Sequence, residues 1–205
     1  MQKIKLFLVV ASFLGLSACV ENSAIEVPFE VTVKRRWDNG NPSLSLEYYD
    51  PGKLSDFLKK DYNKHGVLLV QESFRDYVLD GKTVHFFNNG DTLQSLDYVN
   101  GRISGKVKVW YNSGELKSVA TYHRDTLQVM NQYYKNGQLI SVVPMVKGQL
   151  HGEAVYYDSL GNVEITGAWE NNQRQGEWKH FDQNGKLNAI EVYQNDQIVS
   201  SRDVD

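Results

Sequence analysis

Glycine returns along this chain at a nearly constant interval, and that interval constrains the fold more than any other feature. The successive spacings are 26, 24, 24, 23, 24 and 24 residues. They separate seven glycines: Gly40, Gly66, Gly90, Gly114, Gly137, Gly161 and Gly185. An internal period of roughly 20–50 residues is typical of repeat proteins, in which each copy packs against its neighbours. The sequence therefore predicts one repeat domain over residues 29–205.

Aromatic residues keep the register of these glycines. The first aromatic column lies four residues before each glycine and has Arg36 in the first repeat; its rings are Tyr62, Phe86, Trp110, Tyr133, Tyr157 and Phe181. The second aromatic column lies eight residues after each glycine and has Met145 in the fifth repeat; its rings are Tyr48, Phe74, Tyr98, Tyr122, Trp169 and Tyr193. Because a lone hairpin is unstable in water, we interpret the two columns as a packed ladder of rings. The alternative is a platform on which a ligand stacks.

Turn signals occur twice in each repeat. Four of the glycines follow asparagine, and Asn-Gly is favoured in type I′ hairpin turns, where both central residues have positive φ. A second turn follows about eleven residues later, at Pro51-Gly52, Asn100-Gly101, Arg124-Asp125, Gly148, Asn171-Asn172 and Asn195-Asp196. Two turns per repeat leave strands of about seven to nine residues. The sequence therefore predicts an all-β fold, an elongated antiparallel meander of about seven hairpins.

Two segments depart from the regular pattern. Residues 54–61 have the apolar spacing of a short helix, but Gly52 and Gly66 hold the repeat register, so we predict a distorted hairpin. The other irregular position is Gln128, where neighbouring repeats carry Gly105, Gly152 and Gly176.

The N-terminus has the pattern of an export signal. Lys3 and Lys5 precede an apolar stretch over residues 6–14, which is shorter than the roughly 20 residues of a membrane-spanning helix. The stretch ends in Leu16-Ser17-Ala18-Cys19, which resembles the lipobox of bacterial lipoproteins, and Cys19 is the chain's one cysteine. The resemblance implies a helical signal peptide over residues 1–18, lipidation of Cys19 and a short tether over 19–28. The alternative is an ordinary signal peptide with an incidental cysteine.

The resemblance also gives a location. A lipid anchor on Cys19 implies the membrane as one partner and the bacterial cell envelope as the compartment. Val20 stands where some inner-membrane lipoproteins carry aspartate, which favours the outer membrane.

The repeat itself resembles a known family. Residues 110–116, 133–139 and 180–187, with the turns at 147–152 and 171–178, are similar to the MORN repeat variant of bacterial proteins. The similarity is good over residues 75–195 and loose over 35–74. It implies a hairpin fold and no catalytic motif. Proteins of this kind are often labelled YwqK-type antitoxins, and eukaryotic MORN proteins are described as scaffolding or membrane-associated modules.

The residues that usually carry chemistry form no recognisable site. No two histidines have metal-ligand spacing; they are His65, His85, His123, His151 and His180. Each glycine belongs to a turn, with no helix after it to cradle a phosphate. The formal net charge of −3 argues against nucleic acid as a partner, and Lys34-Arg35-Arg36 is an isolated basic run. We therefore expect a non-catalytic protein without metal or cofactor.

The sequence leaves three candidate functions, which we give from the most favoured to the least. The first is an anchored interaction protein, whose sheet binds an envelope protein or a glycan. The second is an antitoxin or immunity protein, which follows from the family resemblance. The third is an enzyme acting on cell-wall glycans, with the aromatic rings as sugar platforms.

Overall fold

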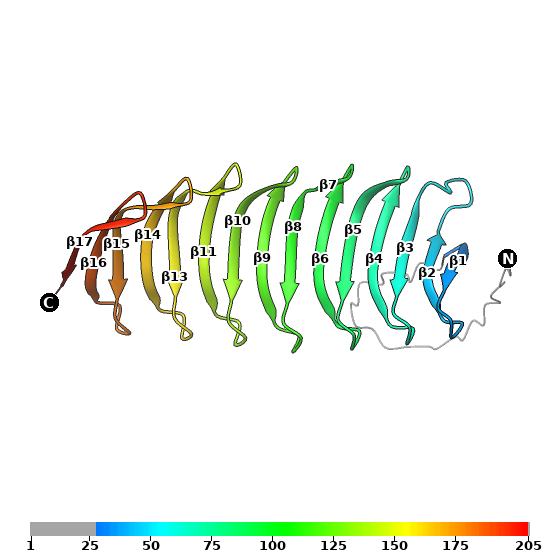
Figure 1. The fold of residues 1–205 in the computed structure, drawn as a ribbon, viewed down its shortest axis with the longest axis horizontal. Coiled ribbons are helices and arrows are strands. Elements are labelled where there is room, and N and C mark those ends of the chain that lie inside the picture. Colours follow the sequence, from blue (N-terminus) through cyan, green and yellow to red (C-terminus); the bar gives the residue numbers. More distant parts are fainter. Residues whose placement is uncertain (1–27, 205) are drawn as a thin grey trace, which may run out of the picture.

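The computed structural model describes residues 28–204, and this part of the chain forms one open antiparallel sheet (Figure 1). Consecutive segments pair in sequence order, so the sheet is a simple meander of hairpins. Its strands are β1 (Glu30–Arg36), β2 (Pro42–Tyr48), β3 (Phe57–Tyr62), β4 (Leu68–Arg75), β5 (Val78–Phe86), β6 (Thr92–Val99), β7 (Arg102–Ile103), β8 (Gly105–Trp110), β9 (Leu116–His123), β10 (Thr126–Tyr133), β11 (Leu139–Val146), β12 (Gln149–Leu150), β13 (Gly152–Tyr157), β14 (Val163–Glu170), β15 (Gln173–Phe181), β16 (Leu187–Gln194) and β17 (Gln197–Asp203). The predicted all-β meander is confirmed.

The predicted export signal and the anchor residue Cys19 lie outside the described residues, as does the tether up to residue 27. Between Pro28 and Val204 the structure has no helix of the length and apolarity that crossing a bilayer requires.

The turns that contain the seven repeat glycines are not of the predicted type. Each of these glycines has a φ between 78° and 97°, but the residue before it, asparagine in four of the seven turns, keeps a negative φ. In the first of these turns the Trp37 N–H donates to Asn41 O at 2.9 Å and the Gly40 N–H donates to Trp37 O at 2.8 Å. This is a type I turn closed by one glycine in a bulge, the usual three-residue hairpin loop. The prediction of type I′ turns at Asn-Gly was wrong.

Type I′ turns occupy the opposite edge of the sheet instead. Both central residues have positive φ at Asn100-Gly101 (49° and 75°) and at Asn171-Asn172 (51° and 67°). The same conformation occurs at Asp76-Tyr77, which the sequence analysis missed because neither glycine, proline nor asparagine marks it. Between β2 and β3 the chain makes an irregular loop, and β3 then starts at Phe57. Residues 57–61 are therefore strand, as the distorted hairpin required.

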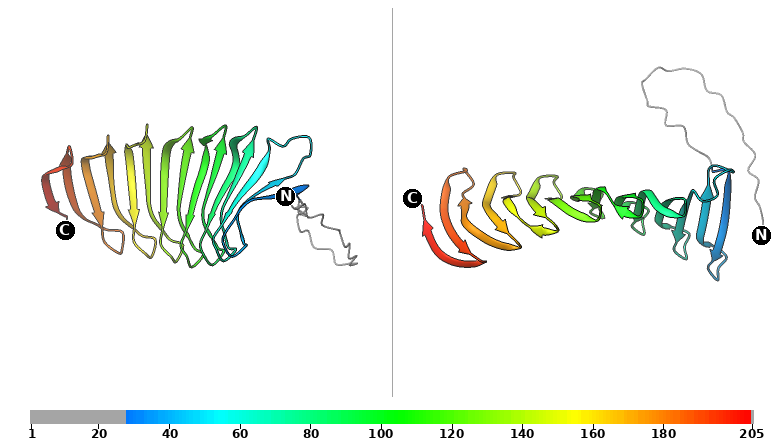
Figure 2. Two further views of the ribbon diagram at one scale, coloured as in Figure 1. Left: turned by 45° about the vertical axis from the view of Figure 1, so that its right-hand side comes forward. Right: turned by 90° about the horizontal axis from the view of Figure 1, so that it is seen from above.

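The two faces of the sheet differ in the side chains that they present. We call face A the face of Leu96, Val107 and Ala120, a buried apolar cluster on β6, β8 and β9. Face B is the opposite face, onto which Lys106 and Lys108 project because side chains alternate along a strand. Figure 2 shows that the sheet is a single twisted layer whose C-terminal strands are strongly curved. Neither face is covered by a second layer of the described chain.

The aromatic ladder consists of two rows on opposite faces. Tyr122 pairs with Gly105 on face A, whereas Trp110 lies two residues beyond Lys108 on face B. The same parity places the whole second column on face A and the whole first column on face B. Ring contacts join members of the second column to other rings, as in the stack of Phe57 on Phe74 with centroids 4.8 Å apart. Within residues 28–204 no ring contact joins two members of the first column.

Hydrogen bonds tie successive hairpins together at both edges. At the glycine turns, ring donors reach the backbone of the next hairpin: Tyr111 Oη donates to Tyr133 O at 3.0 Å, and Tyr134 Oη donates to Tyr157 O at 3.1 Å. At the type I′ turns the backbone does the same, with Asp125 N donating to Ile103 O at 2.8 Å. Each of these hydrogen bonds joins residues about one repeat apart in sequence, so every hairpin is bonded to the next one along the chain.

Candidate functional site

An aromatic cluster covers face A at the C-terminal end of the sheet. Trp178 on β15 lies flat against Gly167 on β14, where a Cβ would overlap the indole ring. Trp169 and Tyr193 meet the same indole edge-on, with ring centroids 5.3 Å and 5.9 Å away. Trp178 is only 6% exposed and Tyr193 only 5%. These rings bury one another, so the cluster is a local core and not an open stacking platform.

A chain of polar groups runs beside these rings. Arg174 donates through Nε to Asp196 Oδ1 at 2.7 Å and through one terminal nitrogen to Tyr193 Oη at 2.7 Å. Tyr193 Oη donates in turn to Glu191 Oε2 at 2.8 Å. His180 Nε2 lies 3.3 Å from the same carboxylate oxygen. Each group has a partner within the chain, which is the expected arrangement for a structural network at the margin of a core.

This network holds its carboxylates in the charged form. The hydrogen bond from Tyr193 lowers the pKa of Glu191, and the hydrogen bond with His180 adds to that effect. The guanidinium of Arg174 lowers the pKa of Asp196 by hydrogen bonding and by its charge. Burial raises the pKa of the Tyr193 hydroxyl, and its bond to Glu191 raises it further.

Three exposed lysines lie together on face B of two neighbouring strands. Lys106, Lys108 and Lys117 on β8 and β9 are exposed, and we call them the basic patch. Within residues 28–204 none of the three forms an ion pair. The Lys117 ammonium lies 5.7 Å from the centre of the Tyr111 ring, a cation–π distance.

Acidic side chains gather on the same face a few strands away. Strand register carries the face of Lys108 across the sheet through Val119, Asn131, Val142, Val155 and Thr166. Alternation from the last two residues places Glu153, Glu164 and Glu170 on face B, and we call these exposed carboxylates the acidic patch. None of them forms an ion pair within the described part of the chain.

An apolar strip separates the two patches. It lies on β9 to β13 and is only half-buried, because no second layer covers it; its members are Val119, Val129, Val142, Pro144 and Val155. Lys106 and Glu153 are four strand steps apart, which corresponds to about 19 Å at the usual strand spacing. The two patches are therefore too far apart to neutralise each other within one chain.

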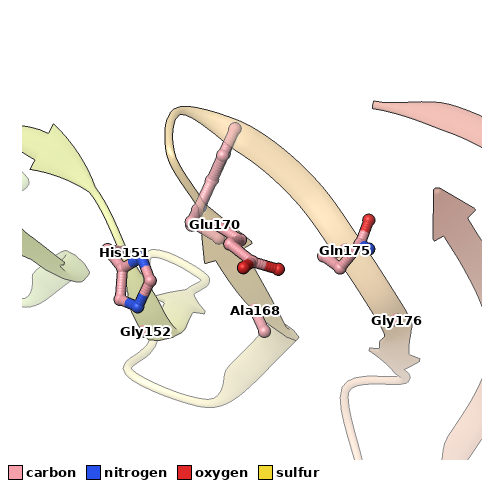
Figure 3. Close-up of a pocket in the computed structure, with 7 residues that line it drawn as sticks. His151, Gly152, Ala168, Glu170, Gln175 and Gly176 are labelled. Carbon is pink, nitrogen blue, oxygen red and sulfur yellow. The ribbon is translucent and has the colours of Figure 1, made fainter. Parts of the chain in front are cut away.

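Two shallow hollows open within and beside the acidic patch. The larger, of about 370 Å³, is lined by His151, Gly152, Ala168, Trp169, Glu170, Gln175 and Gly176. In Figure 3 the carboxylate of Glu170 lies between the ring of His151 and the amide of Gln175. Two of the lining residues are glycines, and a Cβ added at Gly176 would meet no atom within 4 Å.

The smaller hollow, of about 250 Å³, lies at the glycine-turn edge and includes Glu164. Two further carboxylates line it, Asp158 and Asp182. The pKa of Asp158 is lowered, chiefly by the hydrogen bond from the Asn162 side chain, and that of Asp182 by the backbone N–H of Lys186. Asp158 and Asp182 therefore contribute negative charge at neutral pH.

The residues singled out from the sequence lie at the two edges of the sheet. The seven repeat glycines occupy the turns of one edge, the first aromatic column ends the strands that lead into those turns, and the second column lies near the type I′ turns. Among residues 28–204 no three side chains of the metal-binding types gather closely enough to hold an ion.

Sequence reasoning missed the basic patch and the acidic patch on face B. Lys106-Val107-Lys108 carries the alternating signal of a strand with one charged face, but the face that it shares with Glu164 follows only from the strand register. The contact between Gly167 and Trp178 was also missed, because no local pattern predicts which ring covers a glycine on the neighbouring strand.

Comparison with known proteins adds a family name for part of the chain. No curated protein matches the sequence. Two segments, residues 103–124 and 174–195, match the family model of the MORN repeat variant. Each covers one hairpin with its glycine turn, β8 and β9 around Gly114 in the first and β15 and β16 around Gly185 in the second.

Proposed function

We propose that this chain is a non-catalytic envelope lipoprotein, anchored to the membrane through lipid on Cys19, whose sheet binds another molecule of the envelope, either a protein or a glycan. The binding surface in this proposal is face B. Binding there would make the protein a scaffold that holds its partner within the reach of a short tether.

The observation that carries the proposal is the uncovered face B. A sheet normally buries at least one face against another layer, and face A is already packed by its own rings and aliphatic side chains. Face B instead presents an apolar strip between two patches of opposite charge that have no ion-pair partners within the described residues. Charge complementarity of this kind steers association and fixes register between partners.

Binding is tested by capture from extracts of the native envelope with the full lipidated chain as bait. The test variant is Lys106→Glu with Lys108→Glu, and the matched control is Lys53→Glu with Lys64→Glu, two exposed lysines in loops at the other end of the sheet. The proposal expects a saturable partner that the test variant loses and the control retains. Equal recovery by both variants, or no saturable partner, would contradict it.

The anchor is tested separately. Cys19→Ala removes the thiol that would carry lipid, so the protein should leave the membrane fraction and lose incorporation of labelled palmitate. Ser17→Ala, a change beside the same cysteine, should preserve both. Membrane association that survives Cys19→Ala would refute lipid anchoring at this residue.

A further inference from the structure

We propose that the partner seated on face B is a second copy of this chain, which forms a two-fold symmetric dimer with its sheet packed against the first. The inference rests on the proposed binding role of face B and names the occupant. It goes beyond that role because it predicts self-association without any other molecule of the envelope.

The arrangement of charge is the first argument. A two-fold axis makes the same surface face itself, so the surface must be self-complementary about the axis. On face B the basic patch lies on β8 and β9 and the acidic patch on β13 and β14, with β10 and β11 between them. An axis parallel to the strands between β10 and β11 exchanges the two patches. Each basic patch then lies over the acidic patch of the other copy, twice in one dimer.

The positions of individual charges agree with that axis. Glu170 lines the larger hollow, and Glu164 lines the smaller hollow together with Asp158 and Asp182. Lys106 and Lys117, on strands on the opposite side of the axis, have side chains long enough to enter these hollows in the other copy. Within residues 28–204 these lysines form no ion pair, and the hollows supply carboxylates.

The apolar strip supplies the remainder of the interface. Five half-buried valine and proline side chains lie on and beside the proposed axis, where the two copies would approach closest. The surface from β8 to β14 measures about 29 Å across the strands and about 24 Å along them, or about 700 Å² per copy. This is close to the roughly 800 Å² per partner of a standard stable interface. Two sheets of identical twist also pack well, with their strands aligned to within about 30°.

The decisive experiment uses two full-length copies with different tags, produced together and purified through one tag. The wild-type copies should co-purify. Lys106→Glu/Lys108→Glu alone and Glu153→Lys/Glu170→Lys alone should each reduce co-purification by at least about tenfold, since like charges then face each other. Lys53→Glu/Lys64→Glu is the control and should leave it unchanged.

The most discriminating measurement mixes the lysine-reversed copy, Lys106→Glu/Lys108→Glu, with the glutamate-reversed copy, Glu153→Lys/Glu170→Lys. Every contact between patches is again between opposite charges, so the lysine-reversed copy should recover the glutamate-reversed copy. A merely misfolded variant would not be rescued in this way. Failure of the rescue, or unchanged pairing in the single reversals, overturns the dimer.

Crosslinking of the same full-length chains gives an independent readout. Asn131→Cys places a thiol on face B of β10 beside the axis, and Gln132→Cys places one on face A of the same strand. Facing sheets lie about 10 Å apart, too far for a disulfide, so a bismaleimide of about that span is the probe. A crosslinked dimer should form with Asn131→Cys. It should be absent with Gln132→Cys and with the unsubstituted chain.

The outcomes also separate this inference from the proposed function. If copies do not pair but capture of another envelope component still depends on Lys106 and Lys108, the dimer is wrong and the binding role stands. If face B variants change neither pairing nor capture, both proposals are wrong.

Discussion

The contact between Gly167 and Trp178 is the residue-level feature on which the C-terminal end of the sheet depends. Gly167→Ala forces a methyl group into the indole ring and displaces it from Tyr193 and Trp169. Overpacking of this kind costs about 1–3 kcal/mol of unfolding free energy, which urea denaturation followed by tryptophan fluorescence would measure. Gly52→Ala is the control, because Gly52 lies in an exposed loop without positive φ. Equal losses in the two variants would refute the packing role of Gly167.

A second residue-level prediction concerns acid. The pKa of Glu191 is lowered in the folded chain, chiefly by the hydrogen bond from Tyr193, so the folded state binds this proton less readily than the unfolded state. The stabilisation is therefore complete above the ordinary glutamate pKa of about 4.3 and is lost as pH falls through the lowered value. We expect Glu191→Gln to lower the urea midpoint at about pH 7, by a deficit that shrinks progressively as the pH falls below about 4.3. A deficit that stays constant with pH would contradict this assignment.

At the scale of the element, the two edges of the sheet demand different turn residues. Arg124 is exposed and has a φ of 47°, a conformation that asparagine tolerates better than arginine. Arg124→Asn should therefore raise the unfolding free energy by about 0.5–1 kcal/mol in thermal denaturation, provided that Asp125 is retained. Asp125 must stay because its carboxylate accepts the Ile103 N–H at 2.7 Å.

The matched control for this turn is Lys135→Asn. Lys135 lies in a glycine turn, where its φ is negative, so asparagine there relieves no strain. If Lys135→Asn raised the unfolding free energy as much as Arg124→Asn does, the positive φ of Arg124 would not be the cause of the stabilisation.

The spacing of glycines and rings was enough to predict the meander of hairpins, because both recur once per hairpin. It was not enough to predict the type of each turn. Asn-Gly occurs both in the glycine turns and at Asn100-Gly101, and only the backbone geometry distinguishes the bulged type I turn from type I′. The faces of the two aromatic columns were also beyond the sequence, since the glycine bulge shifts the alternation of side chains by one residue.

The candidate binding face was harder still to predict. Lys106 and Glu170 are far apart in sequence, and each looks like an ordinary solvated strand residue. Their position on one face follows from five successive strand pairings. A slip of one residue in any of these pairings would place the two side chains on opposite faces. The export signal and lipidation of Cys19 were predicted from sequence alone, and they stay predictions because they lie outside the described residues.

At the scale of the whole molecule, the sheet is a one-dimensional array. Long-range contacts run between adjacent strands, and the edge strands β1 and β17 lie at opposite ends of the molecule (Figure 1). In such arrays stability is close to a sum of unit terms and nearest-neighbour terms, so a local loss is felt mainly by neighbouring hairpins.

This architecture predicts how the damage from Gly167→Ala spreads. Because β14 contacts mainly β13 and β15, hydrogen exchange should accelerate in the amides of β13 to β16. The amides of β2 to β5 are shielded by four or more intervening strands and should exchange as in wild type. Hydrogen exchange followed by mass spectrometry, with Gly52→Ala as the parallel control, resolves the two regions. Uniform acceleration along the chain would show instead that the sheet unfolds as one cooperative unit, a behaviour that a single layer tied only between neighbours does not explain.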